Sequence, residues 1–388
     1  MSNVFMVAGE SSGDLHGAAV AKALLQSKPS VTITGIGGPK MAEAGVTLTD
    51  DVTSHAAVGL FEAVNSVRHI YDIYTKTVRL LEADKPDVLL LIDYPEFNLR
   101  LARRAKKLGI RVIYYIGPQV WAWRRYRVRI IEKYVDKMLV IFPFEEDFYR
   151  KHGVEVEFVG HPLVKELKNV PGRQESREAL GIDEHRKVIA LLPGSRRKEV
   201  EAIMPALAAA ARLIRQKTDE PPTFLCAKAP AIDAAMIQRH TGGLDAAFRI
   251  VPDDTYRVIR AADAAIVASG TATVETMILG TPMIVVYVMA NLTYILRPII
   301  LHVPHIAMVN IIAGEEAVPE LVQWNAKPEK IAQHALRLLQ PENNREMRER
   351  LAQIAAMLNP VQNNGTTPDT DPDVPMRVAK RILEYVKT

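Results

Sequence analysis

The stretch "IALLPGSRRKEVE", residues 189–201, decides how the fold of this chain is interpreted. It is an apolar strand that ends on Pro-Gly-Ser-Arg and continues as a charged helix. The backbone N–H groups at such a helix start lack partners within the helix, and the helix dipole is positive there, so the junction suits an anion. Taken alone, an ordinary strand–turn–helix corner explains the same residues equally well. The rest of the chain has to distinguish the two interpretations.

Length and composition set the frame. With 388 residues the chain is too long for one core and suits two domains, and its 48% hydrophobic and 24% charged residues are typical of a globular protein. The net charge of +4 is too small to indicate a nucleic-acid partner. The single Cys226 excludes a disulfide framework and fits a reducing cytoplasm. We expect no secretion signal, and no membrane span in the apolar run 283–313, which Arg297, Pro298 and Pro304 interrupt.

Short apolar strands alternate with amphipathic stretches, and they do so twice. The first half contains "VFMVAG", "VTITGIG", "DVLLLID", "RVIYYIG" and "KMLVIF", and the second contains "KVIALLPG", "PTFLCAK", "FRIVP", "DAAIVASG" and "PMIVVYV". This pattern predicts an α/β fold of two doubly wound, Rossmann-like domains with a ligand cleft between the carboxyl ends of their sheets. We expect the domains to span residues 1–165 and 166–358, and residues 359–388 to form a polar loop and a final amphipathic helix that crosses back.

The first strand ends in "AGESSGD", residues 8–14. Ser11 and Asp14 have the spacing of a capping box for a helix over residues 15–27, while Ser12 offers a hydroxyl and Gly13 allows close approach. The capping box leaves Glu10 unexplained. Its carboxylate, at the tip of a buried strand, could hold sugar hydroxyls or accept a proton. The spacing does not match the dinucleotide-binding pattern G-x-G-x-x-G.

The fourth strand ends in "LLLIDYPEFN", residues 89–98, where Asp93 is the first charge after the buried run. Asp93 is either a turn residue before the Tyr-Pro corner or a general base that acts on an incoming hydroxyl. We weigh these two interpretations evenly, and lean to the base because Glu10 emerges at the same sheet edge.

The following stretch, residues 114–130, is rich in tryptophan and arginine. We expect a helix over 121–134. It either packs on the sheet with a solvated outer face or meets anionic lipid phosphates.

An apolar stripe runs along the stretch 58–80 at helical spacing. Base rates favour a surface helix that buries this face in its own domain. The alternative is that part of the face enters a membrane interface or holds acyl chains. The candidate residues for this contact are Leu60, Phe61, Val64, Val67 and Tyr71.

Two helix starts in the second half carry small and hydroxyl residues at strand ends. The candidate ligands there are Gly194, Ser195 and Arg196 in "PGSR", and Ser269, Gly270, Thr271 and Glu275 in "ASGTATVE". Two helix N-termini on one sheet suit a diphosphate, with Arg196 neutralising its charge. Glu275, one turn further along, is placed to accept hydrogen bonds from ribose hydroxyls. The corner at 189–201 therefore gains a function in binding the phosphates of a nucleotide.

From end to end, the chain resembles the lipid-A-disaccharide synthase family of inverting GT-B glycosyltransferases. The resemblance rests on eight ordered blocks, "AGESSGD", "IDYPEFN", "GPQVWAWR", "FPFE", "GHPL", "LLPGSR..EV", "ASGTATVE" and "MVNIIAG". It implies that UDP-2,3-diacylglucosamine and 2,3-diacylglucosamine 1-phosphate are joined into a β-1,6-linked disaccharide phosphate with release of UDP. It also implies that Asp93 is catalytic and that Arg196, Glu275 and Asn310 contact the nucleotide. Gly117 stands where many members have serine, and Ser11 where alanine is common.

The resemblance further implies a Gram-negative source, a peripheral location on the cytoplasmic face of the inner membrane, and a homodimer that exchanges C-terminal segments. In the expected mechanism Asp93 deprotonates the acceptor 6-hydroxyl, and Arg196 with the helix N-termini stabilises the departing UDP. It requires neither a metal nor a cofactor. Glu10 is the alternative base. Two other readings stay open: another UDP-GlcNAc-type transferase or 2-epimerase of the same fold, and a non-catalytic nucleotide-sugar sensor at the membrane.

Overall fold

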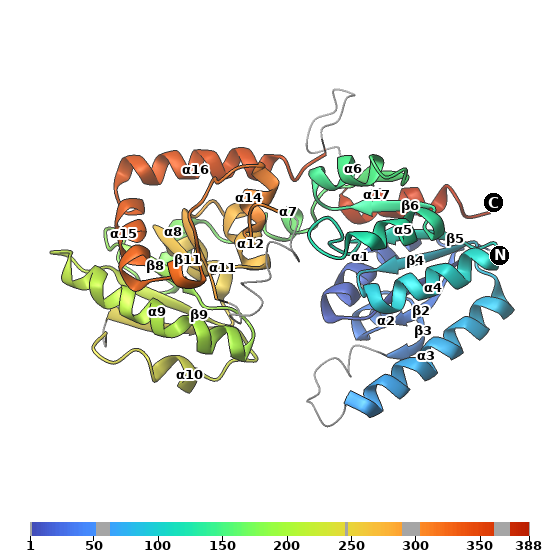
Figure 1. The fold of residues 1–388 in the computed structure, drawn as a ribbon, viewed down its shortest axis with the longest axis horizontal. Helices are drawn as coiled ribbons and strands as arrows, with labels where there is room; N and C mark the ends of the chain where they lie inside the picture. Colours follow the sequence, from blue (N-terminus) through green and yellow to red (C-terminus); the bar gives the residue numbers. More distant parts are fainter. Residues whose placement is uncertain (1, 52–62, 245–246, 289–302, 361–372, 388) are drawn as a thin grey trace. The chain divides into compact units, whose positions relative to one another are not determined.

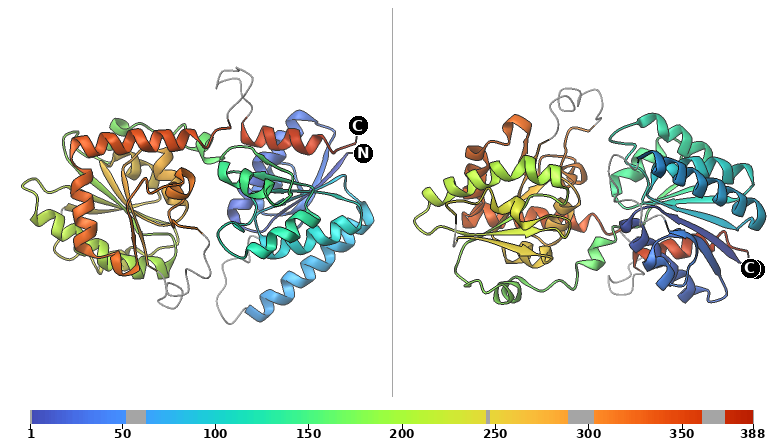
Figure 2. Two further views of the ribbon diagram at one scale, coloured as in Figure 1. Left: turned by 45° about the horizontal axis from the view of Figure 1, so that its top comes forward. Right: turned by 90° about the horizontal axis from the view of Figure 1, so that it is seen from below.

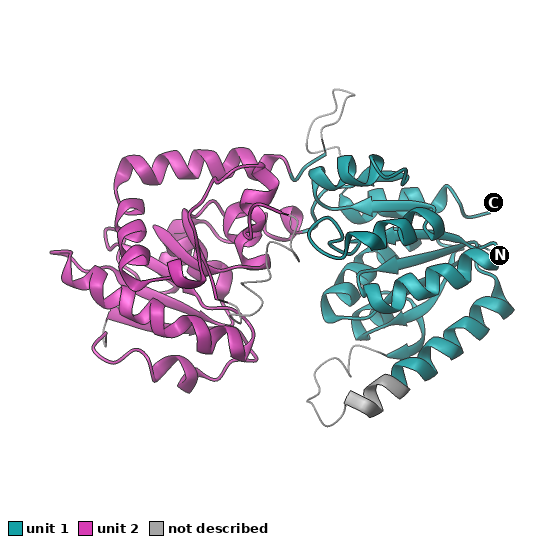
Figure 3. Ribbon diagram, viewed as in Figure 1, with its two compact units in different colours: residues 1–162, 358–388 teal, residues 163–357 magenta. Residues whose placement is uncertain are grey.

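The structure, a computed structural model, describes residues 2–51, 63–244, 247–288, 303–360 and 373–387. The chain divides into two compact units (Figure 3). Unit 1 comprises Met1–Pro162 and Leu358–Thr388, and unit 2 comprises Leu163–Met357. The C-terminal segment therefore belongs to the unit that contains the N-terminus, rather than forming a piece of its own.

Unit 1 is built on a parallel seven-stranded sheet (Figure 1). Its strands are β1 (Asn3–Ala8), β2 (Thr32–Gly37), β3 (Thr47–Asp51), β4 (Val88–Ile92), β5 (Arg111–Tyr115), β6 (Lys137–Val140) and β7 (Val156–Phe158), in the order β3-β2-β1-β4-β5-β6-β7. Its helices are α1 (Ser11–Ser27), α2 (Pro39–Glu43), α3 (Ala63–Asp84), α4 (Pro95–Lys107), α5 (Val128–Tyr134), α6 (Pro143–Arg150) and α17 (Val374–Leu383), with a 3-10 turn at Arg125–Arg127.

Both faces of this sheet are covered, as the apolar strands predict (Figure 2). Alternate residues of β1 point to opposite sides, so Met6 packs with α1 and α17 while Val7 packs with α3, α4 and α5. Val378 and Ile382 bring α17 into the first of these cores. The last helix of the chain is thus part of the unit 1 core.

Unit 2 repeats the design with six parallel strands. They are β8 (Val188–Leu192), β9 (Thr223–Lys228), β10 (Phe248–Pro252), β11 (Ala264–Ala268), β12 (Met283–Tyr287) and β13 (Glu320–Val322), in the order β10-β9-β8-β11-β12-β13. The helices are α7 (Leu163–Glu166), α8 (Arg173–Ala179), α9 (Arg197–Gln216), α10 (Ala234–Gln238), α11 (Thr255–Ala261), α12 (Thr271–Ile278), α14 (Met308–Ala313), α15 (Pro328–Leu338) and α16 (Pro341–Ala356). Cys226 lies buried in the core beneath α9, and burial raises its thiol pKa to about 12.

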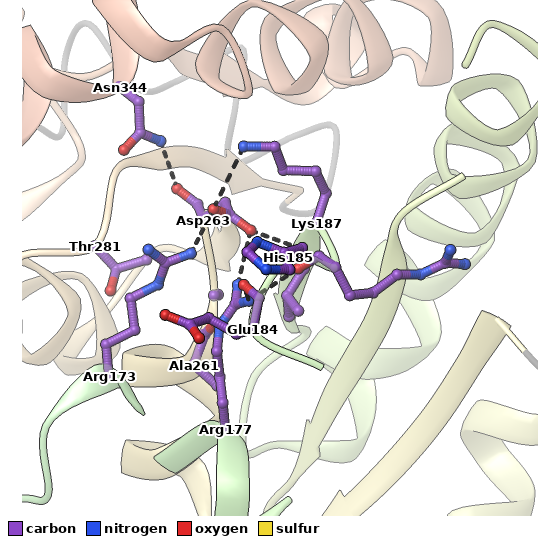
Figure 4. Close-up of polar contacts among 12 residues, drawn as sticks. Arg173, Arg177, Glu184, His185, Lys187, Ala261, Asp263, Thr281 and Asn344 are labelled. Atoms are coloured by element: carbon purple, nitrogen blue, oxygen red, sulfur yellow. Dashed lines mark hydrogen bonds and ion pairs between the residues drawn. The ribbon is translucent and has the colours of Figure 1, made fainter. Parts of the chain in front are cut away.

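The amino-terminal edge of the unit 2 sheet is held by Asp263, which immediately precedes β11 (Figure 4). Its carboxylate pairs with Arg173 at 2.6 Å and with the buried Arg177 at 3.0 Å, and it accepts a 2.8 Å hydrogen bond from the backbone N–H of Val188. Asn344 donates to its carbonyl. A buried carboxylate needs such partners, and this network ties α8, α16 and two central strands together at the edge opposite the strand carboxyl ends.

Two expectations about helices need correction. The expected helix over 121–134 starts only at Val128, because Arg124 has a positive φ of 52° that no α-helix accommodates. The helix expected from the stripe at 58–80 runs from Ala63 to Asp84, and its described buried positions are Ile73, Thr77 and Leu81.

Candidate active site

The sheet of each unit has a point where the strand order reverses, between β1 and β4 in unit 1 and between β8 and β11 in unit 2. In open α/β sheets ligands bind outside the carboxyl ends of the strands at this switch point, because the loops leave in opposite directions and open a crevice. The candidate residues Glu10 and Asp93 follow β1 and β4. Gly194–Arg196 and Ser269–Thr271 follow β8 and β11. All four segments thus occupy the switch points.

Glu10 and Asp93 emerge side by side, since Ala8 of β1 is in register with Ile92 of β4. Glu10 is exposed at the N-cap of α1, whereas Asp93 is half-buried. Burial and then the negative charge of Glu10 raise the pKa of Asp93, against a backbone hydrogen bond from Tyr94 that lowers it. A carboxylate whose pKa is raised in this way is a better proton acceptor than one in water.

The backbone that carries this carboxylate is strained. Asp93 and Tyr94 both have φ of 48°, a left-handed conformation that costs a non-glycine residue about 1–3 kcal/mol. The Asp93 carbonyl accepts hydrogen bonds of 2.6 Å from the side chains of Tyr114 and Asn98, which hold the turn. Gly9 leaves room for the Tyr94 ring, because a Cβ at Gly9 would lie 2.2 Å from it. Sequence analysis missed Tyr114 and Asn98, although the latter lies in the "IDYPEFN" block.

The capping box expected of Ser11 and Asp14 is wrong. The N-cap of α1 is Glu10, which caps through no side-chain bond. The buried Asp14 carboxylate instead accepts hydrogen bonds of 2.9–3.1 Å from the backbone N–H groups of Gly38, Lys40 and Met41 at the start of α2. It therefore fixes the loop after β2.

The other residues of this turn stay at the edge. Ser11 and Ser12 are exposed in the first turn of α1. Gly13 packs on β1, where a Cβ would lie 3.3 Å from the Cβ of Ala8. Of these three residues, the two serines leave exposed side chains at the start of α1.

Two histidines lie near this edge. Burial lowers the pKa of His16, in α1, to about 4, and its ring meets Tyr115 edge-on at 6.4 Å. Burial, and secondarily the charge of His16, lower the pKa of His161 to about 3. Both imidazoles are neutral at pH 7, which fits packing roles.

Glu145 of α6 holds the segment that follows β5. Glu145 belongs to the "FPFE" block, to which sequence analysis assigned no role. The buried Glu145 carboxylate accepts hydrogen bonds from the indole N–H of Trp121 at 3.0 Å and the backbone N–H of Phe142 at 3.1 Å. Burial raises its pKa to about 7. At Gly117, a Cβ would lie 2.3 Å from the terminal methyl of Met138, so Met138 fills the space that a serine side chain would need.

In unit 2, "PGSR" forms an open turn before α9. Gly194 has a φ of 109°, which favours glycine, and a Cβ there would lie 2.7 Å from the Glu199 carboxylate. Ser195 is exposed, and Arg196 is the N-cap of α9. The Arg196 side chain is 84% exposed, and its ion pair with Glu199 is loose at 3.8 Å. Its guanidinium is therefore available to an anion at the helix start.

The neighbouring turn opens α12. Gly270 is the N-cap with a φ of 151°, Thr271 is exposed at the first helical position, and the Ser269 hydroxyl donates to the Ile306 carbonyl at 3.3 Å. One turn in, Glu275 accepts a 3.3 Å hydrogen bond from the Tyr256 hydroxyl. Burial raises the pKa of Glu275. Sequence analysis missed Tyr256, which comes from α11.

Asn310 is fully buried in α14 and its amide is engaged within the unit. Its Nδ2 donates to the Val318 carbonyl and to Glu320, while its Oδ1 accepts from the backbone N–H groups of Ala317 and Val318. Glu320 also accepts from the backbone N–H groups of residues 306 and 307. The side chain of Asn310 thus fixes the 306–320 region, which carries the Ser269 contact.

The candidate membrane contacts are only partly described. Leu60 and Phe61 lie outside the described residues, and the side chains of Val64 and Val67, in α3, are not described either. Tyr71 is 64% exposed, so it does not belong to the buried face of α3. Within the described part of the chain, no helix combines the length and apolarity that crossing a bilayer requires.

Two Rossmann-like units, with carboxylates at the switch point of one and two helix starts at that of the other, define a GT-B glycosyltransferase fold. Solved structures with this fold cover nearly the whole chain. The UDP-GlcNAc 2-epimerase from Neisseria meningitidis aligns with a TM-score of 0.62 at 12% identity, over 99% of this chain and 100% of its own. MurG from Acinetobacter baumannii aligns with a TM-score of 0.60 at 15% identity, over 99% and 100%.

The sequence comparisons identify the family. The family model for lipid-A-disaccharide synthetase matches residues 4–366. The lipid-A-disaccharide synthase of Syntrophus aciditrophicus is 44% identical over 90% of this chain and 92% of its own length, and that of Nitrosococcus oceani is 44% identical over 88% of each. The chain belongs to the lipid-A-disaccharide synthase family, and it is a glycosyltransferase of lipid A biosynthesis.

Proposed function

We propose that this enzyme transfers the diacylglucosaminyl group of UDP-2,3-diacylglucosamine to the 6-hydroxyl of 2,3-diacylglucosamine 1-phosphate. The single observation that carries the proposal is that proton-accepting carboxylates lie at the switch point of unit 1, while anion-binding helix starts lie at the switch point of unit 2. Unit 1 presents Asp93, with a raised pKa, beside Glu10. Unit 2 presents two helix starts on adjacent parallel strands, with the exposed Arg196 at one of them.

Asp93 acts as the general base. It withdraws the proton of the acceptor 6-hydroxyl while that oxygen attacks the anomeric carbon from the side opposite UDP, so one displacement inverts the centre and UDP leaves with its bonding electrons. The negative charge of Glu10 beside it raises the affinity of Asp93 for the proton. The strained turn at Asp93 keeps the carboxylate in place without reorganisation.

The turns of unit 2 bind UDP. Backbone N–H groups at Gly194–Arg196 and at Gly270 and Thr271 meet the diphosphate, because helix starts stabilise the negative charge that develops as UDP departs. Ser269 supports the second turn through its bonds to the carbonyls of Val286 and Ile306. Arg196 adds paired hydrogen bonds to the phosphate oxygens. Glu275 accepts from the ribose hydroxyls. Asn310 acts on the nucleotide through the 306–320 region that it fixes.

Ser11, Ser12 and Gly13 form the acceptor side of unit 1, with Asp14 supporting them through α2. Leu60, Phe61, Val64, Val67 and Tyr71 meet the membrane surface or the acyl chains, which places the enzyme peripherally on the cytoplasmic face of the inner membrane. In a homodimer with exchanged C-terminal segments, the partner's α17 would replace the same helix against α1. The exposed side chain of Tyr71 supports the membrane contact, and the packing of Val378 inside the core of unit 1 supports α17 as the exchanged element.

The test is incubation with acylated donor and acceptor in detergent, followed by mass analysis. We expect the disaccharide 1-phosphate and UDP in equal amounts. UDP-GlcNAc without acyl chains serves as the control substrate. Its rapid conversion, to a disaccharide or to an epimer, would contradict the proposal in favour of another enzyme of this fold, and UDP binding without any product would favour a sensor.

A further inference from the structure

A basic segment that the proposed reaction does not use lies on the same edge of unit 1 as Asp93. This basic segment, Trp123–Arg127, follows β5 and precedes α5. It contains three arginines among five residues. The strand that leads to it, β5, pairs with β4, so the segment and Asp93 leave neighbouring parallel strands at their carboxyl ends.

The segment is locked to the turn of Asp93 by one carboxylate. Glu96, in the first turn of α4, accepts a 2.6 Å hydrogen bond from Nη1 of Arg124 and a second bond, on the same oxygen, from the buried Arg127. These two guanidinium groups, the bond to Arg127 first, lower the pKa of Glu96. Glu96 lies in the helix that begins two residues after Asp93, so both arginines bind the element that directly follows the proposed base.

Charge and conformation both indicate that Arg124 serves a ligand. The Glu96 carboxylate faces two guanidinium groups, so these three side chains together keep a net positive charge. Arg124 adopts a strained φ of 52°, and its guanidinium lies 4.4 Å from the Trp123 ring centroid, which orients the planar group. Its bond to Glu96 uses one of five N–H donors. Four donors remain outside this bond on a side chain that is 42% exposed.

We propose that Arg124, held by Glu96 and Trp123, binds the phosphomonoester of the acceptor. This inference rests on the proposed function, which supplies an acceptor with a 1-phosphate. A phosphomonoester carries a charge of about −1.5 to −2 at pH 7 and three oxygens that match a guanidinium. In the acceptor, the phosphate and the reacting 6-hydroxyl are attached on either side of the ring oxygen. A sugar that spans from Arg124 to Asp93 therefore presents the correct hydroxyl to the base.

The test uses Arg124→Gly, because glycine accepts the positive φ and the variant loses the guanidinium without added backbone strain. Arg129→Ala is the matched control: it removes one positive charge from an exposed position of α5. The Michaelis constants for the phosphorylated acceptor and for its unphosphorylated counterpart are compared in detergent. Where the unphosphorylated acceptor turns over too slowly, inhibition by water-soluble glucosamine 1-phosphate is compared with inhibition by glucosamine.

We expect Arg124→Gly to raise the KM for the phosphorylated acceptor by about 10- to 100-fold, the effect of losing a charge-assisted hydrogen-bond pair, and to leave the unphosphorylated acceptor unchanged. Inhibition by glucosamine 1-phosphate should weaken by the same factor. An equal effect on both acceptors, or none, overturns the inference. The inference is also overturned if Arg124→Gly leaves the KM for the phosphorylated acceptor unchanged but no longer sediments with phosphatidylglycerol vesicles. That result would assign Arg124 to lipid headgroups. Failure of the wild-type enzyme to form the disaccharide would instead contradict the proposed function.

Discussion

The hydroxyl of Tyr114 donates a 2.6 Å hydrogen bond to the backbone carbonyl of Asp93. Tyr114 lies in β5 and is fully buried, and burial holds its pKa well above the ordinary value, so the phenol remains a donor at any physiological pH. Asn98 donates to the same carbonyl. The left-handed turn at Asp93 is therefore held by the sheet and by α4, and the carboxylate that it carries is fixed before substrate arrives.

The first prediction separates the two carboxylates at this edge. Asp93→Asn should reduce kcat by about 100- to 10,000-fold, the usual contribution of a general base, and leave UDP affinity unchanged. Glu10→Gln should keep turnover but alter its pH dependence. The base must be ionised, so kcat/KM falls as pH drops through the raised pKa of Asp93. Removing the neighbouring negative charge lowers this pKa, so the acid limb should move to lower pH.

The measurement is a pH profile of kcat/KM for the wild type and both variants, with UDP affinity from calorimetry. If Glu10→Gln abolished turnover while Asp93→Asn retained it, the roles of the two carboxylates would be exchanged.

The second prediction concerns Arg196. Its side chain is 84% exposed and its pair with Glu199 is loose, so it contributes little to folding. Arg196→Ala should weaken UDP binding by about 10- to 100-fold, because a charge-assisted pair to phosphate is lost, and should change the free energy of unfolding by less than about 0.5 kcal/mol. Calorimetric titration with UDP measures the first effect. Arg197→Ala, at the next exposed position, is the control, and equal weakening in both variants would indicate only a general charge effect.

The third prediction addresses the network at the opposite edge of unit 2. Asp263→Ala leaves Arg177, whose side chain is 4% exposed, without its carboxylate, so we expect destabilisation by about 3–5 kcal/mol. Arg173→Ala should cost less than about 1 kcal/mol, because that side chain is 47% exposed. Native-state hydrogen–deuterium exchange at the backbone amides of β8 and β11 measures the free energy of unfolding of this unit. Similar losses for both variants would show that Asp263 does not hold the network together.

Much of this architecture follows from the sequence, because parallel strands buried on both faces are continuous apolar runs. Once the strands are assigned, Glu10 and Asp93 must emerge at one edge, and so must the turns at Arg196 and Gly270. The family comparison confirms the family that the eight ordered blocks indicated. These inferences needed only local patterns and the direction of the strands.

What the sequence did not reveal depends on partners distant in the chain. Asp14 has capping-box spacing with Ser11, yet its carboxylate binds N–H groups that lie 24–27 residues later. Trp121 looked like part of an amphipathic helix, but its indole N–H donates to Glu145 of α6, 24 residues later. A residue spacing specifies which local bonds are feasible. It does not show which competing long-range donor lies closer once the loops have packed.

The last prediction uses this buried Glu145. Its pKa is raised from 4.5 to about 7, so between these values the folded protein keeps a proton that the unfolded chain has released. Its contribution to stability is therefore full below pH 4.5 and is lost as pH rises through 7, a change on the order of 3 kcal/mol. Glu145→Gln is neutral at every pH and should remove this part of the slope. Urea unfolding at pH 5 and pH 7.5, followed by tryptophan fluorescence of unit 1, measures the difference between variant and wild type. Because Gln cannot ionise, the variant should become more stable relative to the wild type as pH rises. If the difference in the free energy of unfolding between the two proteins stayed constant across the two pH values, Glu145 would already be ionised in the folded protein at pH 5.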